Sequence, residues 1–146
     1  SCNVYSFDPF YEDVLFKNRR MQLSLNENAY QVPVDDKWTY FKLGITGNLI
    51  KANKNLNNLA NGDILTYDKV VQLTGHENKI IDIVKMDVEG GEKEFLETIN
   101  MDYFCKYVKQ FILEVHIIEN STRLLQRLEK CFYLFHRDTR FFKGEA

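Results

Sequence analysis

The chain has 146 residues, of which 45% are hydrophobic and 14% aromatic, and its formal net charge is −2. This size and apolar content are enough to build the core of a single globular domain over residues 1–146. The small negative charge, with no basic stripe along the sequence, argues against a nucleic-acid partner. No apolar run has the length that a membrane-spanning helix needs, and the compartment is left open.

The three cysteines, Cys2, Cys105 and Cys131, are odd in number, widely spaced and without a CxxC pair. We therefore expect small buried thiols rather than a disulfide framework or a zinc site. The triplet Asn120-Ser121-Thr122 matches a glycosylation acceptor, but the same residues can cap the helix that follows. We favour the capping role, because the acceptor role would require a secreted chain.

Residues Asn3 to Phe7 alternate and carry β-forming side chains, which predicts a strand ended by Asp8-Pro9. Asp8 stands where nucleoside-binding α/β folds place a carboxylate for ribose hydroxyls, although it could equally cap the following helix. The apolar spacing predicts that helix from Phe10 to about Leu25 and a second strand from Trp38 to Ile45. The Asn-rich stretch from Lys51 to Gly62 predicts a surface loop.

The apolar run from Ile80 to Val88 has hydrophobic residues on both faces, which is typical of a central parallel strand covered by helices on both sides. A helix precedes it in the second half of residues 63–73, ended by Thr74-Gly75. Ligands bind beyond the C-terminal ends of such strands, which makes Asp87 a functional candidate. Glu92 alone is better explained as a complement to the positive end of the helix that follows Gly90-Gly91.

A further strand is predicted from Val108 to Ile118, with the polar residues Glu114 and His116 near its end. A lone histidine at a strand end is more often half-buried and bonded to backbone than catalytic. Residues Ser121 to Cys131 return to a helical pattern, and Phe132 to Phe142 begins as a strand. This alternation of strands and helices predicts an α/β domain with a mainly parallel sheet.

Several of these segments together resemble a known family. FDP after the first strand, WTYFKLGI, ILTYDKVV, KMDVEGGE and LEVH are similar to segments of the FkbM-type S-adenosylmethionine-dependent methyltransferases and their animal methyltransferase-like relatives. The likeness covers most of the chain, and KMDVEGGE is its most specific element. It implies a Rossmann-like class I methyltransferase fold, with helices on both faces of the sheet, and methyl transfer from S-adenosylmethionine to an oxygen or nitrogen nucleophile.

The resemblance also implies roles for individual residues. Asp8 is similar to the carboxylate that binds the ribose of the cofactor, and Asp87 to the residue beside the methionine end and the reaction centre. Gly44 and Ile45 fall near the expected position of the adenine.

On the acceptor side, the resemblance places Glu114 and His116 at the tip of the fifth strand, where either could remove a proton from a hydroxyl nucleophile. The acceptor itself cannot be read from the sequence. The carboxylates Asp87, Glu89 and Glu92 match no recognised metal loop, and we expect no metal.

The family's glycine-rich cofactor loop, which follows its first strand, has no counterpart among these residues. The resemblance therefore implies a domain truncated at the first strand and at the last, which binds the cofactor weakly by itself. Loss of the first strand would expose two strand edges, open to self-association, or force Asn3 to Phe7 to pair with Ile80 to Val88. The alternatives are a non-catalytic binding module of the same fold and another nucleotide-binding α/β enzyme.

Overall fold

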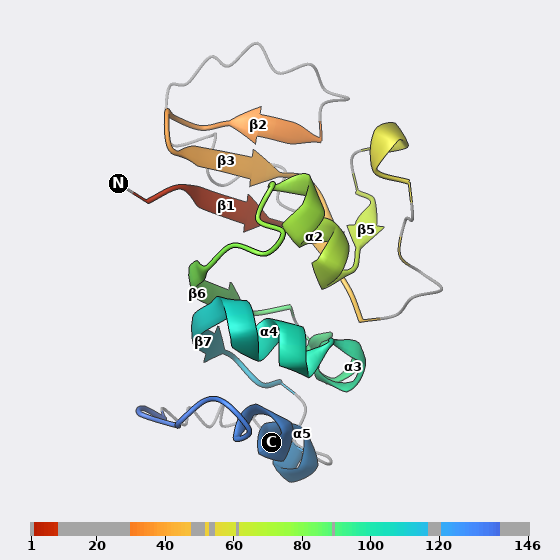
Figure 1. Cartoon of the computed structure of the whole chain (residues 1–146). Coiled ribbons are helices and arrows are strands. Elements are labelled where there is room, and N and C mark those ends of the chain that lie inside the picture. Colours follow the sequence, from red (N-terminus) through yellow and green to blue (C-terminus); the bar gives the residue numbers. More distant parts are fainter. Residues whose placement is uncertain are drawn as a thin grey trace, which may run out of the picture.

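The computed structural model describes residues 2–8, 30–47, 52, 55–60, 62–88, 90–116 and 121–137. The helix predicted from Phe10 to Leu25 and the glycosylation acceptor Asn120 lie outside these residues. Strands and helices are both present, as the sequence predicts, but the described strands form three separate ladders (Figure 1). A single continuous sheet is therefore not seen in the part of the chain that the structure describes.

The first ladder contains three strands in the order β1-β3-β2. β1 (Val4–Phe7) runs parallel to β3 (Trp38–Phe41), and β2 (Gln31–Pro33) runs antiparallel to β3. The rings of Phe7 and Phe41 stack with their centroids 4.7 Å apart, at the C-terminal ends of β1 and β3. The strand predicted from Asn3 to Phe7 is therefore confirmed, and its partner is β3 rather than the Ile80 to Val88 strand.

The predicted strand from Trp38 to Ile45 is divided in two, because the chain leaves the first ladder at Lys42. The Lys42 N–H donates to the Tyr30 carbonyl, and the Lys42 carbonyl accepts from the Gly62 N–H. The chain then enters a short second ladder, in which β4 (Gly44–Ile45) and β5 (Ile64–Leu65) are parallel.

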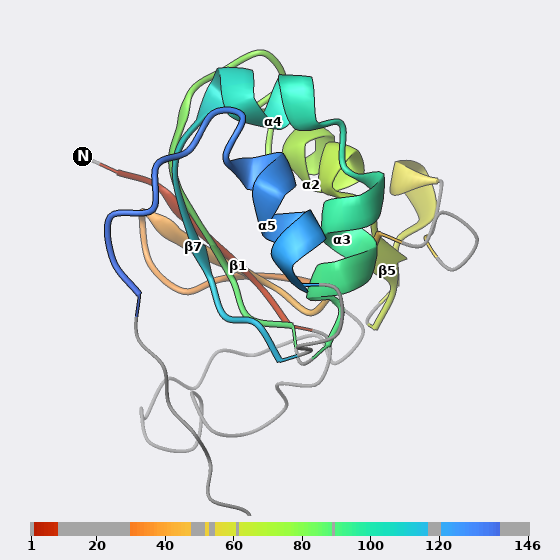
Figure 2. The same ribbon diagram turned by 90° about the horizontal axis from the view of Figure 1, so that it is seen from below.

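The third ladder is parallel and joins β6 (Ile81–Met86) to β7 (Val108–Leu113). The helices that the structure describes are α2 (Tyr67–Leu73), α3 (Glu92–Thr98), α4 (Met101–Tyr107) and α5 (Ser121–Leu128), with a 3-10 turn, η1 (Leu56–Asn58). Figure 2 shows α3, α4 and α5 together on one side of the β6–β7 ladder. Among the described residues, no helix is both long and apolar enough to cross a bilayer.

Coverage of β6 on both sides was expected, and the described residues show it on one side. Met86, on the face toward the helices, is 4% exposed, whereas Ile83 and Ile112 on the opposite face are 55% and 47% exposed. A continuous apolar pattern does not by itself show whether an element of the fold packs against each face.

Two clusters of buried side chains form the core. The larger one is built around the aromatic rings of Phe95, Phe104 and Phe111, from α3, α4 and β7, which meet edge to face or tilted. The smaller one gathers around Phe41 of β3 and Leu65 of β5, in the first two ladders. Ile45 of β4 packs against both clusters and so couples the ladders to the helical layer.

The prediction of three small buried thiols is wrong for each cysteine. Cys105 in α4 and Cys131 after α5 form a disulfide, with 26 residues of sequence separation and Cα atoms 5.6 Å apart, while Cys2 is free and exposed. The pairing depends on how α5 packs near α4, which the spacing of cysteines does not reveal. The strand predicted from Phe132 is also not formed through Arg137, where Tyr133, Leu134 and Phe135 are exposed.

Removing the disulfide by the double substitution Cys105→Ser and Cys131→Ser should lower the free energy of unfolding by about 3 kcal/mol, because the bond limits the entropy of the unfolded chain. Urea unfolding of the variant and the wild type measures this difference. Cys2→Ser is the matched control and should leave the stability unchanged. A double variant as stable as the wild type would contradict the assigned constraint.

Candidate functional site

The site lies at the turn that joins β6 to α3. Asp87 and Val88 follow the last residue of β6, and Gly90 has a φ angle of 101°, a left-handed conformation that favours glycine. Helix α3 then begins at Glu92. The predicted placement of carboxylates at a strand-to-helix turn is confirmed for Asp87 and Glu92, whereas Glu89 lies outside the described residues.

Glu92 is a buried carboxylate, with only 2% of its surface exposed. Its Oε1 accepts the Val88 N–H at 3.1 Å, and its Oε2 accepts the Gly90 N–H at 3.0 Å. Burial by itself would raise the pKa of Glu92, but hydrogen bonds from its own backbone, from His116 and from these two N–H groups outweigh burial and lower the pKa. The side chain therefore remains ionised inside the protein.

His116 follows β7 and points back toward α3. The Glu114 N–H donates to the Met86 carbonyl at 3.0 Å, which extends the β6–β7 pairing beyond Leu113 and brings His116 to the β6–α3 turn. His116 Nδ1 lies 3.0 Å from Glu92 Oε1. A partner for this histidine was expected from the backbone, but the ring nitrogen instead contacts a buried carboxylate.

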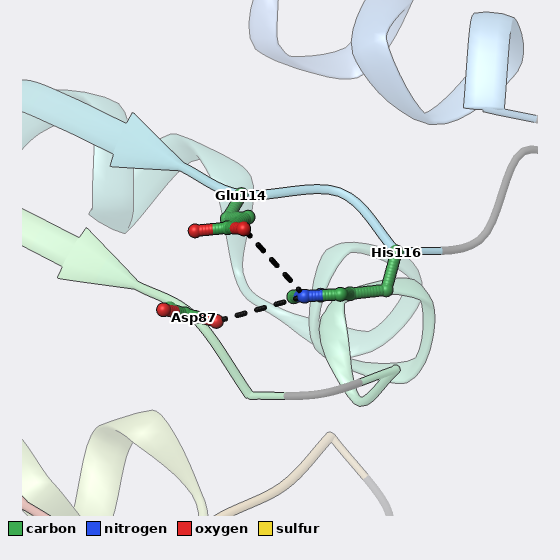
Figure 3. A group of neighbouring side chains, drawn as sticks. All are labelled: Asp87, Glu114 and His116. Atoms are coloured by element: carbon green, nitrogen blue, oxygen red, sulfur yellow. Dashed lines mark ion pairs between the residues drawn. The ribbon is translucent and has the colours of Figure 1, made fainter. Parts of the chain in front are cut away.

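Three side chains converge at the C-terminal ends of β6 and β7. His116 Nε2 lies 3.8 Å from Asp87 Oδ1 and 3.8 Å from Glu114 Oε1 (Figure 3). The Asp87 side chain is 34% exposed, and its Oδ2 is 3.3 Å from Lys85 Nζ. The structure thus brings together Asp87, Glu114 and His116, the three residues that the sequence analysis names as catalytic candidates.

The same three side chains have the donor types of a metal site, and their ligand atoms lie within 4.8 Å of one another. We assign no metal to them, because all three residues are exposed and exposed acidic groups commonly gather without an ion. Of the other carboxylates considered from the sequence, Glu92 is buried and accepts the Val88 and Gly90 N–H groups, and Glu89 lies outside the described residues.

Asp8 lies directly after β1, at the C-terminal end of the strand. Its N–H donates to the Phe41 carbonyl, and its own carbonyl accepts the Tyr40 hydroxyl at 2.8 Å. These contacts hold the backbone of Asp8 at the tip of β1. The arrows of β1 and β6 point the same way in Figure 1, so Asp8 and Asp87 both follow strands with the same direction.

Gly44 and Ile45 lie in the second ladder, opposite Ile64 and Leu65. The chain beyond them touches α3, because a Cβ on Gly47 would lie 2.0 Å from the Glu94 carbonyl oxygen. Gly44 is buried and Ile45 belongs to the core, so both have a structural role whether or not adenine lies nearby.

The pairing of Glu92 with His116 is the feature of the site that the sequence analysis missed. The two residues are 24 positions apart, and no local pattern links them. The available signal was topological: both follow neighbouring parallel strands, whose C-terminal ends meet at one edge of a sheet.

Glu92→Gln should remove an acid-sensitive part of the stability. The folded-state pKa of Glu92 lies below its usual value of 4.5, so its carboxylate stabilises the fold above that pH. This contribution is lost as the pH falls from 4.5 through the lowered folded-state pKa. The free energy of unfolding, measured across this range, should therefore fall more steeply for the wild type than for the variant.

Glu94→Gln provides the matched control, because Glu94 lies on the same helix and accepts only a 3.3 Å contact from Thr46 Oγ1 through its Oε2. This variant should keep the steep wild-type dependence on pH. Parallel curves for the wild type and Glu92→Gln would contradict the assignment of an ionised, buried Glu92.

A comparison with known protein families identifies the chain. The family model described as a methyltransferase domain matches residues 24–146, which is more than half of the sequence. No curated protein and no solved structure matches the chain. On the strength of the family match, the chain belongs to the methyltransferase-domain family.

Proposed function

We propose that this protein transfers a methyl group from S-adenosylmethionine to an oxygen or nitrogen atom of an acceptor, in the manner of the FkbM-type methyltransferases. Membership of the methyltransferase-domain family supports methyl transfer in general. The observation that carries the proposal further is the convergence of Asp87, Glu114 and His116 at the C-terminal ends of two parallel strands. That edge is where open α/β sheets bind ligands.

The fold proposed for the whole domain is the Rossmann-like class I methyltransferase fold. Parallel pairing of β1 with β3 and of β6 with β7 supports it, as does the direct passage from β6 through a glycine turn into α3. The antiparallel β2 stands at the edge of its ladder, a position at which a mainly parallel sheet accepts such a strand.

The side chains at the strand ends suit the proposed cofactor. S-adenosylmethionine supplies a methyl group on a positively charged sulfonium. The Asp8 carboxylate would accept hydrogen bonds from the ribose hydroxyls, and the exposed Asp87 carboxylate would lie beside the positive charge. Gly44 and Ile45 would lie near the adenine.

On the acceptor side, Glu114 and His116 are proposed to receive the proton that a hydroxyl or amine loses on methylation. His116 is the better placed, because its Nε2 faces two carboxylates that stabilise the imidazolium formed by proton uptake. The work of the protein is then to align the two reactants and to balance the charges that develop between them.

Asp8→Ala and Asp87→Ala should each weaken the binding of S-adenosylmethionine by about tenfold or more, because a hydrogen bond to a charged group contributes roughly 1.5–3 kcal/mol. Calorimetric titration of each variant measures the loss.

Asp82→Ala is the control for the loss of one negative charge. Asp82 lies on β6 but is 65% exposed and pairs with Lys109 at 2.6 Å. The Asp82→Ala variant should bind the cofactor as the wild type does. Wild-type affinity in both Asp8→Ala and Asp87→Ala would refute the proposed cofactor site.

A further inference from the structure

Glu92, the first residue of α3, contacts the ring of His116 on the side away from Asp87 and Glu114. Glu92 is buried beneath the site, and its Oε1 is shared between the Val88 N–H and His116 Nδ1. Capping of the turn explains the two backbone hydrogen bonds. It does not explain why the same carboxylate also binds the imidazole.

We propose that Glu92 is the positioning residue that holds His116 in the tautomer with the proton on Nδ1 and the lone pair on Nε2. An ionised carboxylate can only accept hydrogen bonds, so the ring nitrogen that contacts it must carry the proton. In the neutral imidazole the other nitrogen is then the base. Nδ1 contacts Glu92 at 3.0 Å, which leaves Nε2 as the basic atom.

The basic nitrogen faces the reaction side of the site. Asp87 Oδ1 and Glu114 Oε1 each lie 3.8 Å from Nε2, beyond hydrogen-bonding distance but close enough to favour a positive ring. Lys85 is the described cation nearest to them, 3.3 Å from the far oxygen of Asp87. Glu92 therefore sets both the direction of the ring and which nitrogen can take up a proton.

The catalytic consequence rests on the proposed methyl transfer. Nε2 takes the proton that the acceptor oxygen or nitrogen loses when its lone pair forms the bond to the methyl carbon. The electron pair of the broken carbon–sulfur bond stays with sulfur, and the imidazolium later gives its proton to solvent. His116 is thus the candidate base, and Glu92 acts through it.

The tautomer can be measured without cofactor or acceptor, by the ¹⁵N chemical shifts and ring couplings of the histidines in the labelled protein at a pH where the ring is neutral. The wild type should show His116 protonated on Nδ1. Glu92→Gln should raise the share of the tautomer protonated on Nε2. A wild-type ring protonated on Nε2 would overturn the proposal whatever the variants do.

A second readout is the rate at which diethyl pyrocarbonate acylates each histidine, followed by mass spectrometry of the peptides. The acylation of His116 should slow by about threefold or more in Glu92→Gln, because fewer rings present the Nε2 lone pair. His76 and His136 are the other two histidines and serve as internal standards. Their rates report any general loss of structure.

Glu94→Gln is the matched control, since it removes the same charge from the same helix without touching His116. Its His116 tautomer and acylation rate should equal those of the wild type. Equal tautomer populations in Glu92→Gln and Glu94→Gln would overturn the positioning role. Because neither readout involves methyl transfer, failure of the proposed function would show separately, as an absence of cofactor binding.

Discussion

The arrangement of the candidate site depends on burying the charge of one carboxylate, that of Glu92. Removing an ionised group from water is costly unless hydrogen bonds replace the lost solvation. Here the replacement comes from Val88 and Gly90 in the turn after β6 and from His116 in the segment after β7, while Glu92 itself begins α3. One buried charge therefore ties together three segments of the chain, and each must be in place for the others to be satisfied.

The hydrophobic core places that carboxylate. Phe95, one turn after Glu92 on α3, is 2% exposed and packs edge to face against Phe104 of α4, so the face of α3 that carries both residues must turn inward. At the other end of α3, the Arg127 guanidinium of α5 donates to the carbonyls of Leu96 and Ile99. Helix α3 is thus held at its first turn by Glu92 and at its last turn by Arg127. The rigid helix gives the polar contacts at the turn a fixed geometry.

Local patterns in the sequence predicted the strands at β1 and β6, and they placed Asp87 at a strand-to-helix turn and Glu114 and His116 near a strand end, because strand ends and turns leave clear signals in residue order. Features that depend on how distant segments pack could not be predicted in this way. The Cys105–Cys131 bond requires α4 and the end of α5 to meet, and the exposure of Ile83 depends on what covers a sheet face. The contact between Glu92 and His116 belongs to the same class, since it exists only once β6 and β7 are paired.

The central proposal is that the ends of β1 and β6, together with His116 after β7, form one cofactor-binding methyl-transfer site. Titration of the ¹⁵N-labelled protein with S-adenosylhomocysteine, followed by nuclear magnetic resonance, tests it most directly because weak binding is also detected. We predict saturable shifts of the Asp8, Asp87 and Gly90 amides together with the His116 ring signals, and little change around Cys105 and Cys131. Shifts confined to other parts of the protein, or none at millimolar ligand, would contradict the account.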